Sequence, residues 1–297
     1  MSRVVVLSGA TGFIGRRLAE YLLTDGWQVR GIARDIHAAT ASGDPRIVWY
    51  AGDLSGQADP TVWRQAQVLI HAAWSPAHKQ PEKTSQENRE GSQRFFAQAL
   101  DAGIAKRIFL SSMSAHERAL SAYGKSKFAV EAMLRPQQDL VVRPGFVIGN
   151  GGVHAAMTRA IEKSIIIPSF YGGQQLVQPI AVDDLCLGIC AALARDVTGR
   201  VTYAEEAPIT VDVFYRAIAD SLGQTRKPIV HFPGQAAAAL LAVCERIGLS
   251  LPMTTENLLG LKALEPTFVA DDLRRVGLAP KPYREALADL AALRRAT

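Results

Sequence analysis

The chain has 297 residues, of which 48% are hydrophobic and 21% are charged, and its formal net charge is +5. This composition fits a globular protein with one large domain, or a large domain with a smaller one attached. The positive charge suits an anionic small molecule. The lysines and arginines form no block, so a nucleic-acid partner is not expected.

The cysteines and the apolar runs indicate where such a chain functions. Cys186, Cys190 and Cys244 are odd in number and lack the spacing of a metal site, which favours a reducing compartment and predicts no bound metal. The longest apolar run, residues 236–244, is too short to cross a bilayer, and the first residues enter a strand pattern rather than a signal peptide. We therefore expect a cytoplasmic protein without a membrane partner.

Strand and helix patterns alternate over the first half of the chain. Strands are predicted at residues 3–8, 28–33, 46–50, 66–71, 106–111 and 140–143, and helices at 11–25, 81–102 and 122–134. Such alternation predicts βαβ units with parallel strands and right-handed crossovers. We expect an α/β fold, a Rossmann-type doubly wound parallel sheet over residues 1–150, whose ligand lies at the C-terminal ends of the strands.

The pattern is less regular beyond residue 144. Helices are predicted at residues 183–194, 210–222 and 235–247 and within 265–290, and a loop at 149–152. Residues 151–297 are therefore expected to form a smaller C-terminal substrate-side region, partly interleaved with the first. Aromatic and histidine side chains that follow strand ends in either part of the chain are candidate pocket residues, and the alternative for each is an ordinary core or surface position: Trp74, His78, Phe146, His154, Phe170 and Tyr171.

A glycine-rich turn joins the first strand to the first helix. In the sequence SGATGFIG, Gly9 permits a tight turn, Gly12 lets the backbone approach a pyrophosphate, and Gly15 lets the helix pack closely on the sheet. The free N–H groups at the start of the helix then bind the phosphates. The alternative is a turn that needs its glycines for packing alone.

The end of the second strand indicates which dinucleotide binds. A fold specific for NAD usually has an acid there, on the ribose 2′-hydroxyl. Here Ala33 occupies that position and Arg34 follows, and a guanidinium can bind a 2′-phosphate through two hydrogen bonds. We therefore expect NADP rather than NAD. The alternative is that Arg34 is a solvated charge beside Asp35.

Tyr123 and Lys127 are four residues apart and share one face of a predicted helix. The pKa of free tyrosine is about 10, but a nearby ammonium and an oxidised nicotinamide favour the phenolate. Tyr123 could then exchange a proton with a substrate hydroxyl or carbonyl, while Ser112 holds that oxygen. Ser111 or Ser114 could supply the hydroxyl instead. The alternative to a catalytic pair is a surface tyrosine beside a lysine.

These motifs resemble the short-chain dehydrogenase/reductase superfamily, and SGATGFIG looks most like its extended or atypical branches. The resemblance implies a catalytic set of Ser112, Tyr123 and Lys127, joined by Asn88 in the pattern N-x-x-G-[ST]. It also implies these contacts with the dinucleotide: Gly9, Thr11, Gly12, Phe13, Ile14, Gly15, Arg34, Asp53, Leu54, His71, Ala72, Ala73, Ser111, Tyr123, Lys127, Pro144, Gly145 and Val147.

The chain departs from typical nucleotide-sugar epimerases and dehydratases of that superfamily. Its stretch from Ser112 to Tyr123 is short, and residues 173–184 lack the arginine that holds the substrate diphosphate, with Ala181 in place of a histidine. Arg159 or Lys163 could substitute.

The function expected first is that of an NADP-dependent oxidoreductase acting on the alcohol/carbonyl pair of a small molecule. Two alternatives stay open: a nucleotide-sugar epimerase or dehydratase with a retained cofactor, and a non-catalytic NADPH-binding sensor or assembly subunit. The sequence leaves open whether the protein is a monomer or a homodimer.

Overall fold

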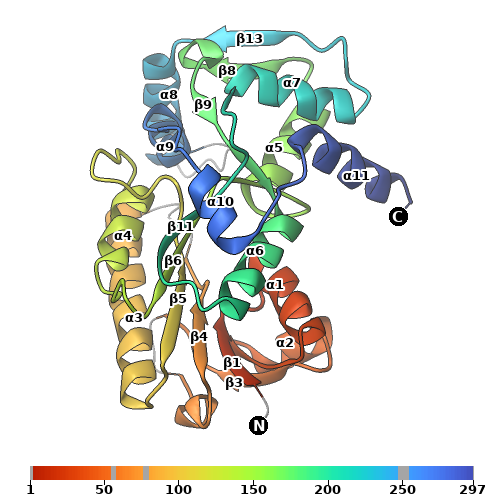
Figure 1. Ribbon diagram of the computed structural model, residues 1–297. Coiled ribbons are helices and arrows are strands. Elements are labelled where there is room, and N and C mark those ends of the chain that lie inside the picture. The colour runs from red at the N-terminus through yellow and green to blue at the C-terminus, as the bar shows by residue number, and fades with distance from the viewer. Residues whose placement is uncertain (1–2, 55–57, 76–79, 247–253, 297) are drawn as a thin grey trace.

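The computed structural model describes residues 3–54, 58–75, 80–246 and 254–296 (Figure 1). Seven parallel strands form the central sheet, in the order β11–β6–β5–β4–β1–β2–β3. They are β1 (Arg3–Ser8), β2 (Trp27–Ala33), β3 (Val48–Ala51), β4 (Val68–His71), β5 (Lys106–Leu110), β6 (Leu140–Pro144) and β11 (Gly199–Tyr203). The strand order reverses between β1 and β4, which makes the C-terminal ends of these two strands the expected ligand crevice.

Helices cover both faces of the sheet. The helices α1 (Phe13–Thr24) and α6 (Val182–Ala194) pack on one face, and α3 (Pro81–Asp101) and α4 (Ala122–Glu131) on the other (Figure 1). Because successive side chains of a strand point to opposite faces, Val5 and Leu7 enter one core cluster and Val6 enters the other. Strands buried on both faces explain the uninterrupted apolar runs. The predicted doubly wound α/β fold is confirmed.

The predicted helices and strands of the sheet agree with the structure to within a few residues at each end. The sequence missed the short helix α2 (Ile36–Ser42), the helix α5 (Gly152–Lys163), the 3-10 turn η1 (Pro60–Trp63) and β11, the seventh strand of the sheet. It also missed the short strands that lie outside the central sheet after residue 144. The helix α2 has one buried residue, Ala39, so its sequence carries no apolar stripe. The loop predicted at residues 149–152 extends one residue too far, because Gly152 is the first residue of α5.

The substrate-side region is built from small sheets and helices around a core cluster of its own. Its paired strands are β7 (Phe146–Ile148) with β10 (Pro179–Ala181), β8 (Ile167–Phe170) with β13 (Ile229–Phe232), and β9 (Leu176–Val177) with β12 (Ile209–Thr210). Its other elements are η2 (Tyr171–Gly173), α7 (Val211–Ser221), α8 (Gly234–Arg246), α9 (Thr255–Lys262) and α11 (Tyr283–Ala296). The last residue of the helix predicted at 235–247, Ile247, lies outside the described residues.

The chain returns to the central sheet after residue 150. The helix α6 packs on α1, β11 pairs with β6, and the helix α10 (Ala270–Val276) packs on β11. The two parts are therefore interleaved, although the proposed division at residue 150 stays a prediction. In the described part of the chain, no helix combines the length and the apolarity that crossing a bilayer requires.

Candidate active site

Two glycines of the first turn are required by packing within the protein. Gly9 has a φ of +74°, and a Cβ added to it would lie 2.6 Å from the backbone nitrogen of Ala73. A Cβ on Gly15 would lie 2.1 Å from the carbonyl oxygen of Gly9. The turn, the start of α1 and the loop after β4 are therefore in direct backbone contact.

Gly12 differs from the other two glycines. It is exposed, its φ is −78°, and a Cβ added to it would lie 3.2 Å from the carbonyl oxygen of Gly9 and within 4 Å of no other atom of the described residues beyond its own chain neighbours and helix backbone. Gly12 is also the N-cap of α1 and has no side chain to satisfy the N–H groups of the first turn. Packing alone does not account for this glycine, whereas an anion that approaches the helix start does. The turn therefore fits the pyrophosphate of a dinucleotide.

The next two residues of the motif face the protein. The ring of Phe13 packs against a glycine-rich loop, since a Cβ on Gly149 or on Gly151 would lie 2.4 Å from that ring. Ile14 packs against the core cluster on the α1 face of the sheet. The backbone N–H groups of these two residues, rather than their side chains, are therefore the groups predicted to contact a dinucleotide.

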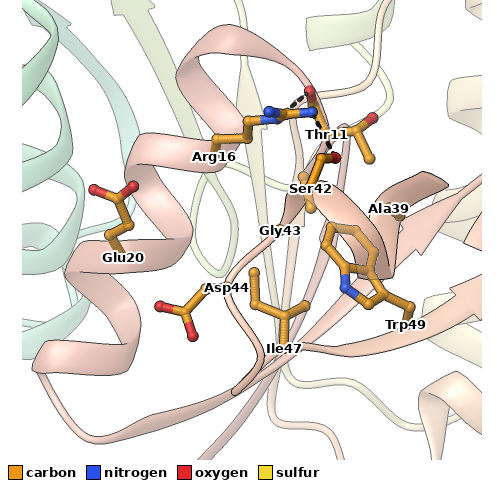
Figure 2. Close-up of a pocket in the computed structure, with 10 residues that line it drawn as sticks. Thr11, Arg16, Glu20, Ala39, Ser42, Gly43, Asp44, Ile47 and Trp49 are labelled. Carbon is orange, nitrogen blue, oxygen red and sulfur yellow. Dashed lines mark hydrogen bonds between the residues drawn. The ribbon is translucent and has the colours of Figure 1, made fainter. Parts of the chain in front are cut away.

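The residues after β2 separate an arginine from an acid. Arg34 is exposed, whereas the carboxylate of Asp35 accepts a hydrogen bond from the N–H of Ala38, at 2.9 Å, and caps α2. Nearby, a cavity of about 150 Å³ lies between α1, α2 and β3 (Figure 2). At its mouth Arg16 donates to the carbonyl of Thr11, at 2.9 Å, and to the hydroxyl of Ser42, at 3.2 Å.

His71 is held inside the protein by a defined chain of hydrogen bonds. Its Nδ1 lies 2.7 Å from the Ser8 hydroxyl and its Nε2 lies 2.9 Å from the Ser92 hydroxyl. Because Ser92 donates its own proton to the carbonyl of Asn88, at 2.7 Å, Nε2 must carry the hydrogen. Burial, with the nearby Lys127 charge, lowers the pKa of His71 to about 3. A neutral His71 therefore serves the core, while the backbone of Ala72 and Ala73 faces the glycine turn.

Asn88 holds the loop that follows β4. Its amide donates to the carbonyl of Ser75, at 2.9 Å, and accepts from the N–H of the same residue, at 2.8 Å. Asn88 is 1% exposed, so both bonds lie in the interior. On the preceding loop, Leu54 packs beneath α3, where a Cβ on Gly91 would lie 2.5 Å from the Leu54 carbonyl oxygen. Asp53, next to it, is half-buried.

Tyr123 and Ser112 meet at the C-terminal edge of the sheet. Ser121 caps α4 by accepting from the N–H of Gly124, at 3.1 Å, which places Tyr123 in the first turn. Burial raises the pKa of the Tyr123 phenol, and the hydrogen bond between this phenol and Ser112 acts in the opposite direction. Tyr123 nevertheless keeps 36% of its surface exposed, so a ligand can reach it. This pairing supports the predicted set of Ser112, Tyr123 and Lys127 over the alternative of a surface tyrosine beside a lysine.

Lys127 is buried between aromatic rings. Its ammonium group donates to the carbonyl of Leu110, at 2.6 Å, and lies 3.8 Å from the ring centre of Trp74 and 4.6 Å from that of Phe109. The ring centre of Tyr123 is 5.9 Å away. Burial lowers the pKa of Lys127 to about 7. The rings favour the cation, but water is excluded, so this amine changes charge near neutral pH.

Ser111 points away from Tyr123. Its hydroxyl donates to Glu131, and the Glu131 carboxylate also accepts from Arg143 at 2.8 and 2.6 Å. The side chains of Glu131 and Arg143 are 8% and 13% exposed. This buried network occupies Ser111, whereas Ser112 accepts from the N–H of Ser114, at 3.1 Å, and reaches the phenol.

The segment after β6 crosses the same edge of the sheet. The carbonyl of Pro144 accepts from the N–H of Met113, at 3.1 Å, and a Cβ on Gly145 would lie 2.0 Å from the carbonyl oxygen of Gln178. Val147 is partly buried against the core cluster of the α1 face. The predicted dinucleotide contacts of this segment thus lie beside the loop that carries Ser112.

The candidate pocket residues separate into two groups. Trp74 belongs to the site, because its ring stands edge-on to Tyr123 at 6.0 Å. Phe146, His154 and Phe170 have partners within the substrate-side region, in Phe214, the carbonyl of Gly149 and Phe232. Tyr171 covers Gly234, and His78 lies outside the described residues. In the part of the chain that the structure describes, no cluster of His, Cys, Asp or Glu could hold a metal ion.

The family profile described as "NAD dependent epimerase/dehydratase family" matches residues 5–203, about two thirds of the chain. The chain belongs to this family. It thereby belongs to the extended branch of the short-chain dehydrogenase/reductase superfamily, and members of the family are enzymes that bind NAD(P).

Relatives within the family carry different activities in their names. The chain is 30% identical over 206 residues to a ceramide reductase of Caulobacter vibrioides, a match that covers 68% of this chain and 64% of the relative. It is 25% identical over 200 residues to a UDP-glucose 4-epimerase of Vibrio cholerae, which covers 57% of this chain and 60% of the relative. The matches thus span less than two thirds of either relative's length.

Solved structures share the whole fold. A protein named gox2253 superposes with a TM-score of 0.75 at 22% identity, covering 99% of this chain and 98% of its own. A UDP-glucose 4-epimerase from Thermotoga maritima superposes with a TM-score of 0.72 at 17% identity, covering 99% of both chains. At these identities the likeness establishes the architecture alone.

A matched pair of glycine variants tests the dinucleotide turn of this family member. Gly12→Ala should change the free energy of unfolding by about 1 kcal/mol or less, because its methyl group meets little of the protein. It should weaken NADPH binding about tenfold or more, because the methyl group blocks the approach of a phosphate. Gly15→Ala should instead destabilise the fold by about 1–3 kcal/mol. Fluorescence titration and urea unfolding measure both; unchanged NADPH affinity in Gly12→Ala would contradict the assignment.

The burial of Lys127 predicts a pH-dependent stability. Its pKa is lowered to about 7 in the folded protein, whereas the unfolded chain holds this proton to about pH 10.5. The cost of burying the charge is therefore full below pH 7 and declines as the pH rises. The gain in unfolding free energy from Lys127→Met should be larger at pH 6 than at pH 9, by on the order of 2 kcal/mol. Lys83→Met, on the exposed face of α3, is the control for thermal unfolding without nucleotide; equal gains at both pH values would contradict the prediction.

Proposed function

We propose that this protein is an NADP-dependent oxidoreductase that interconverts an alcohol and a carbonyl group. The observation that carries the proposal is the meeting of three groups: the Ser112 hydroxyl on the Tyr123 phenol, and the buried amine of Lys127 one helical turn further along α4. A phenol, a hydroxyl and an amine at the edge of a dinucleotide fold can together donate and accept protons, which is the chemistry that interconversion of an alcohol and a carbonyl requires.

The proposed mechanism assigns one task to each group. In the direction of reduction, Tyr123 donates its proton to the carbonyl oxygen while Ser112 donates a hydrogen bond to the same oxygen. The charge of Lys127 stabilises the phenolate that results, and the phenolate regains a proton from solvent. The bound dinucleotide supplies the hydride that reaches the carbonyl carbon. Asn88 supports these steps through the loop that carries Trp74 and Ser75.

NADP is proposed as the cofactor on the residues after β2. Ala33 leaves no acid at this position to repel a 2′-phosphate, Arg34 is exposed beside it, and the adjacent acid, Asp35, is engaged as the cap of α2. An arginine binds a phosphate through charge and paired hydrogen bonds. These residues support NADP over NAD.

Reduction of a small carbonyl compound is preferred to rearrangement of a nucleotide sugar. Residues 173–184 contain no arginine or lysine for a diphosphate, and Trp74 offers an apolar surface next to Tyr123. One of the relatives described above is named a ceramide reductase, which supports the same choice. The other is named an epimerase and keeps the second candidate in view: the same three residues with a cofactor recycled in each turnover. Location in the cytoplasm, and a monomeric or homodimeric state, stay predictions.

The preference for NADP is tested by titrating the protein with NADPH and with NADH. NADPH should bind about tenfold tighter or more, and Arg34→Ala should abolish that preference, because the guanidinium is the proposed partner of the 2′-phosphate. Arg216→Ala on α7, whose guanidinium binds the carbonyl of Thr225, is the control. Stronger binding of NADH regardless of Arg34 would show that the assignment is wrong.

The chemistry is tested with a panel of aldehydes and ketones that carry aliphatic or aromatic groups, following NADPH absorbance. Net consumption of NADPH is expected, and Tyr123→Phe should reduce kcat about a hundredfold or more, with a much smaller effect on the affinity for NADPH. Ser112→Ala should reduce kcat more than Ser114→Ala does, because Ser112 alone of the two is bonded to the phenol. A UDP-sugar converted without net consumption of NADPH would favour the epimerase. Tight NADPH binding with no turnover, and no cellular effect of Tyr123→Phe, would favour a sensor.

A further inference from the structure

A carboxylate from the substrate-side region lies on the first turn of the helix that carries Tyr123. Glu256, in the first turn of α9, accepts a hydrogen bond from the N–H of Tyr123 at 3.2 Å, and its carboxylate also accepts from the N–H of Ala122. These N–H groups have no acceptor within α4. With Ser121 bonded to Gly124, the start of α4 is held by two side chains, one local and one 133 residues away in sequence.

The same part of the chain grips the loop that joins Ser112 to Tyr123. His116 donates from Nε2 to the carbonyl of Ala263, at 2.9 Å, and Arg118 pairs with Glu265 at 3.1 Å. The helix α9 lies against α4 as a result (Figure 1). Residues 255–265 thus contact both the loop and the helix start, and we call them the α9 clamp.

The hydrogen bond from Tyr123 to Glu256 is itself exposed to solvent, whereas Glu256 as a whole is partly covered by the protein. Glu256 is half-buried, and this burial raises its pKa, an effect increased by Glu82 and opposed by the N–H groups of Tyr123 and Ala122 and by the charge of Lys125. Its carboxylate faces the positive end of α4, where an anion is favoured. By contrast, Arg118 is 81% exposed, so its ion pair with Glu265 is expected to contribute little.

We infer that Glu256 is a positioning residue for Tyr123. It fixes the backbone of the first turn of α4, and through it the direction in which the phenol leaves the helix toward Ser112. The inference rests on the proposed role of Tyr123 as the proton donor. Through Glu256, the substrate-side region also sets the position of the Tyr123 phenol, because α9 belongs to that region and α4 packs on the central sheet.

The position of the Tyr123 ring can be followed without any substrate or nucleotide. In the full-length protein labelled with ε-¹³C tyrosine, the Tyr123 signal is identified by its loss in Tyr123→Phe. Because this ring stands edge-on to Trp74 at 6.0 Å, its chemical shift responds to small rotations. Glu256→Ala should move or broaden the Tyr123 signal and leave the other tyrosine signals in place. Glu256→Gln keeps an acceptor oxygen and should restore most of the native shift.

Glu265→Gln is the matched control, because it weakens another contact of the α9 clamp that does not touch α4. It should leave the Tyr123 signal unchanged. The inference is overturned if Glu256→Ala leaves that signal in place, if it moves every tyrosine signal alike, or if Glu265→Gln has the same effect.

A pH series on the native protein gives an independent measurement. As the pH falls through the raised pKa of Glu256, the carboxylate gains a proton and its hold on the N–H groups weakens, so the Tyr123 signal should shift with a midpoint above 4.5. Glu256→Gln should abolish this step. A second step near pH 7, from Lys127, should remain in both proteins. Persistence of the lower step in Glu256→Gln would overturn the inference.

The third measurement is kcat with any carbonyl compound of the panel that the native protein reduces. Glu256→Ala should lower kcat about tenfold to a hundredfold and leave the affinity for NADPH unchanged, since small displacements of a reacting group have effects of this size. Failure to bind NADPH would refute the proposed function but not the NMR result. A displaced Tyr123 ring with unchanged kcat would refute the positioning role.

Discussion

The close contact of three backbone segments at Gly9 is the constraint on which the site depends. A side chain at Gly9 would collide with Ala73, and one at Gly15 would collide with Gly9 itself, so the first turn, α1 and the loop after β4 admit one arrangement. That arrangement places the start of α1 after the C-terminal end of β1, beside β4, where the strand order reverses and a dinucleotide is expected. It also starts the loop from which Trp74 reaches the amine of Lys127.

Charge at the site is controlled by the exclusion of water. His71 and Lys127 are both buried and both have lowered pKa values, but the two differ in their partners. His71 is bonded on both ring nitrogens by serines that suit its neutral form, so it keeps one charge state. Lys127 has one carbonyl and two aromatic rings, which suit a cation, so burial and partners compete. An amine whose pKa lies near neutral pH can gain or lose its proton when a charged cofactor binds beside it.

The fold and the core of the site could be predicted from sequence because their signals are local. Buried parallel strands are apolar runs, the glycine turn is one short motif, and Tyr123 with Lys127 is a helical spacing. The choice between Ser111 and Ser112 could not be made in this way. Adjacent residues at a strand end point in different directions, and only the position of Glu131, twenty residues further on, shows that Ser111 is engaged. Glu256 was beyond reach for the same reason, since its acceptor role depends on a helix that is 133 residues distant. The strand β11 was missed because its five residues, GRVTY, carry three polar or small side chains.

The return of the chain to its own sheet limits how this protein can be divided. The strand β11 and the helix α6 come from beyond residue 150, yet they cover β6 and α1. A fragment that ended at residue 150 would leave β6 as a bare edge and would expose an apolar side of α1 to water. Such a fragment would be prone to self-association rather than ready for transfer as a nucleotide-binding module. Exchanging the part of the chain after residue 150 for another would therefore break the central sheet between β6 and β11.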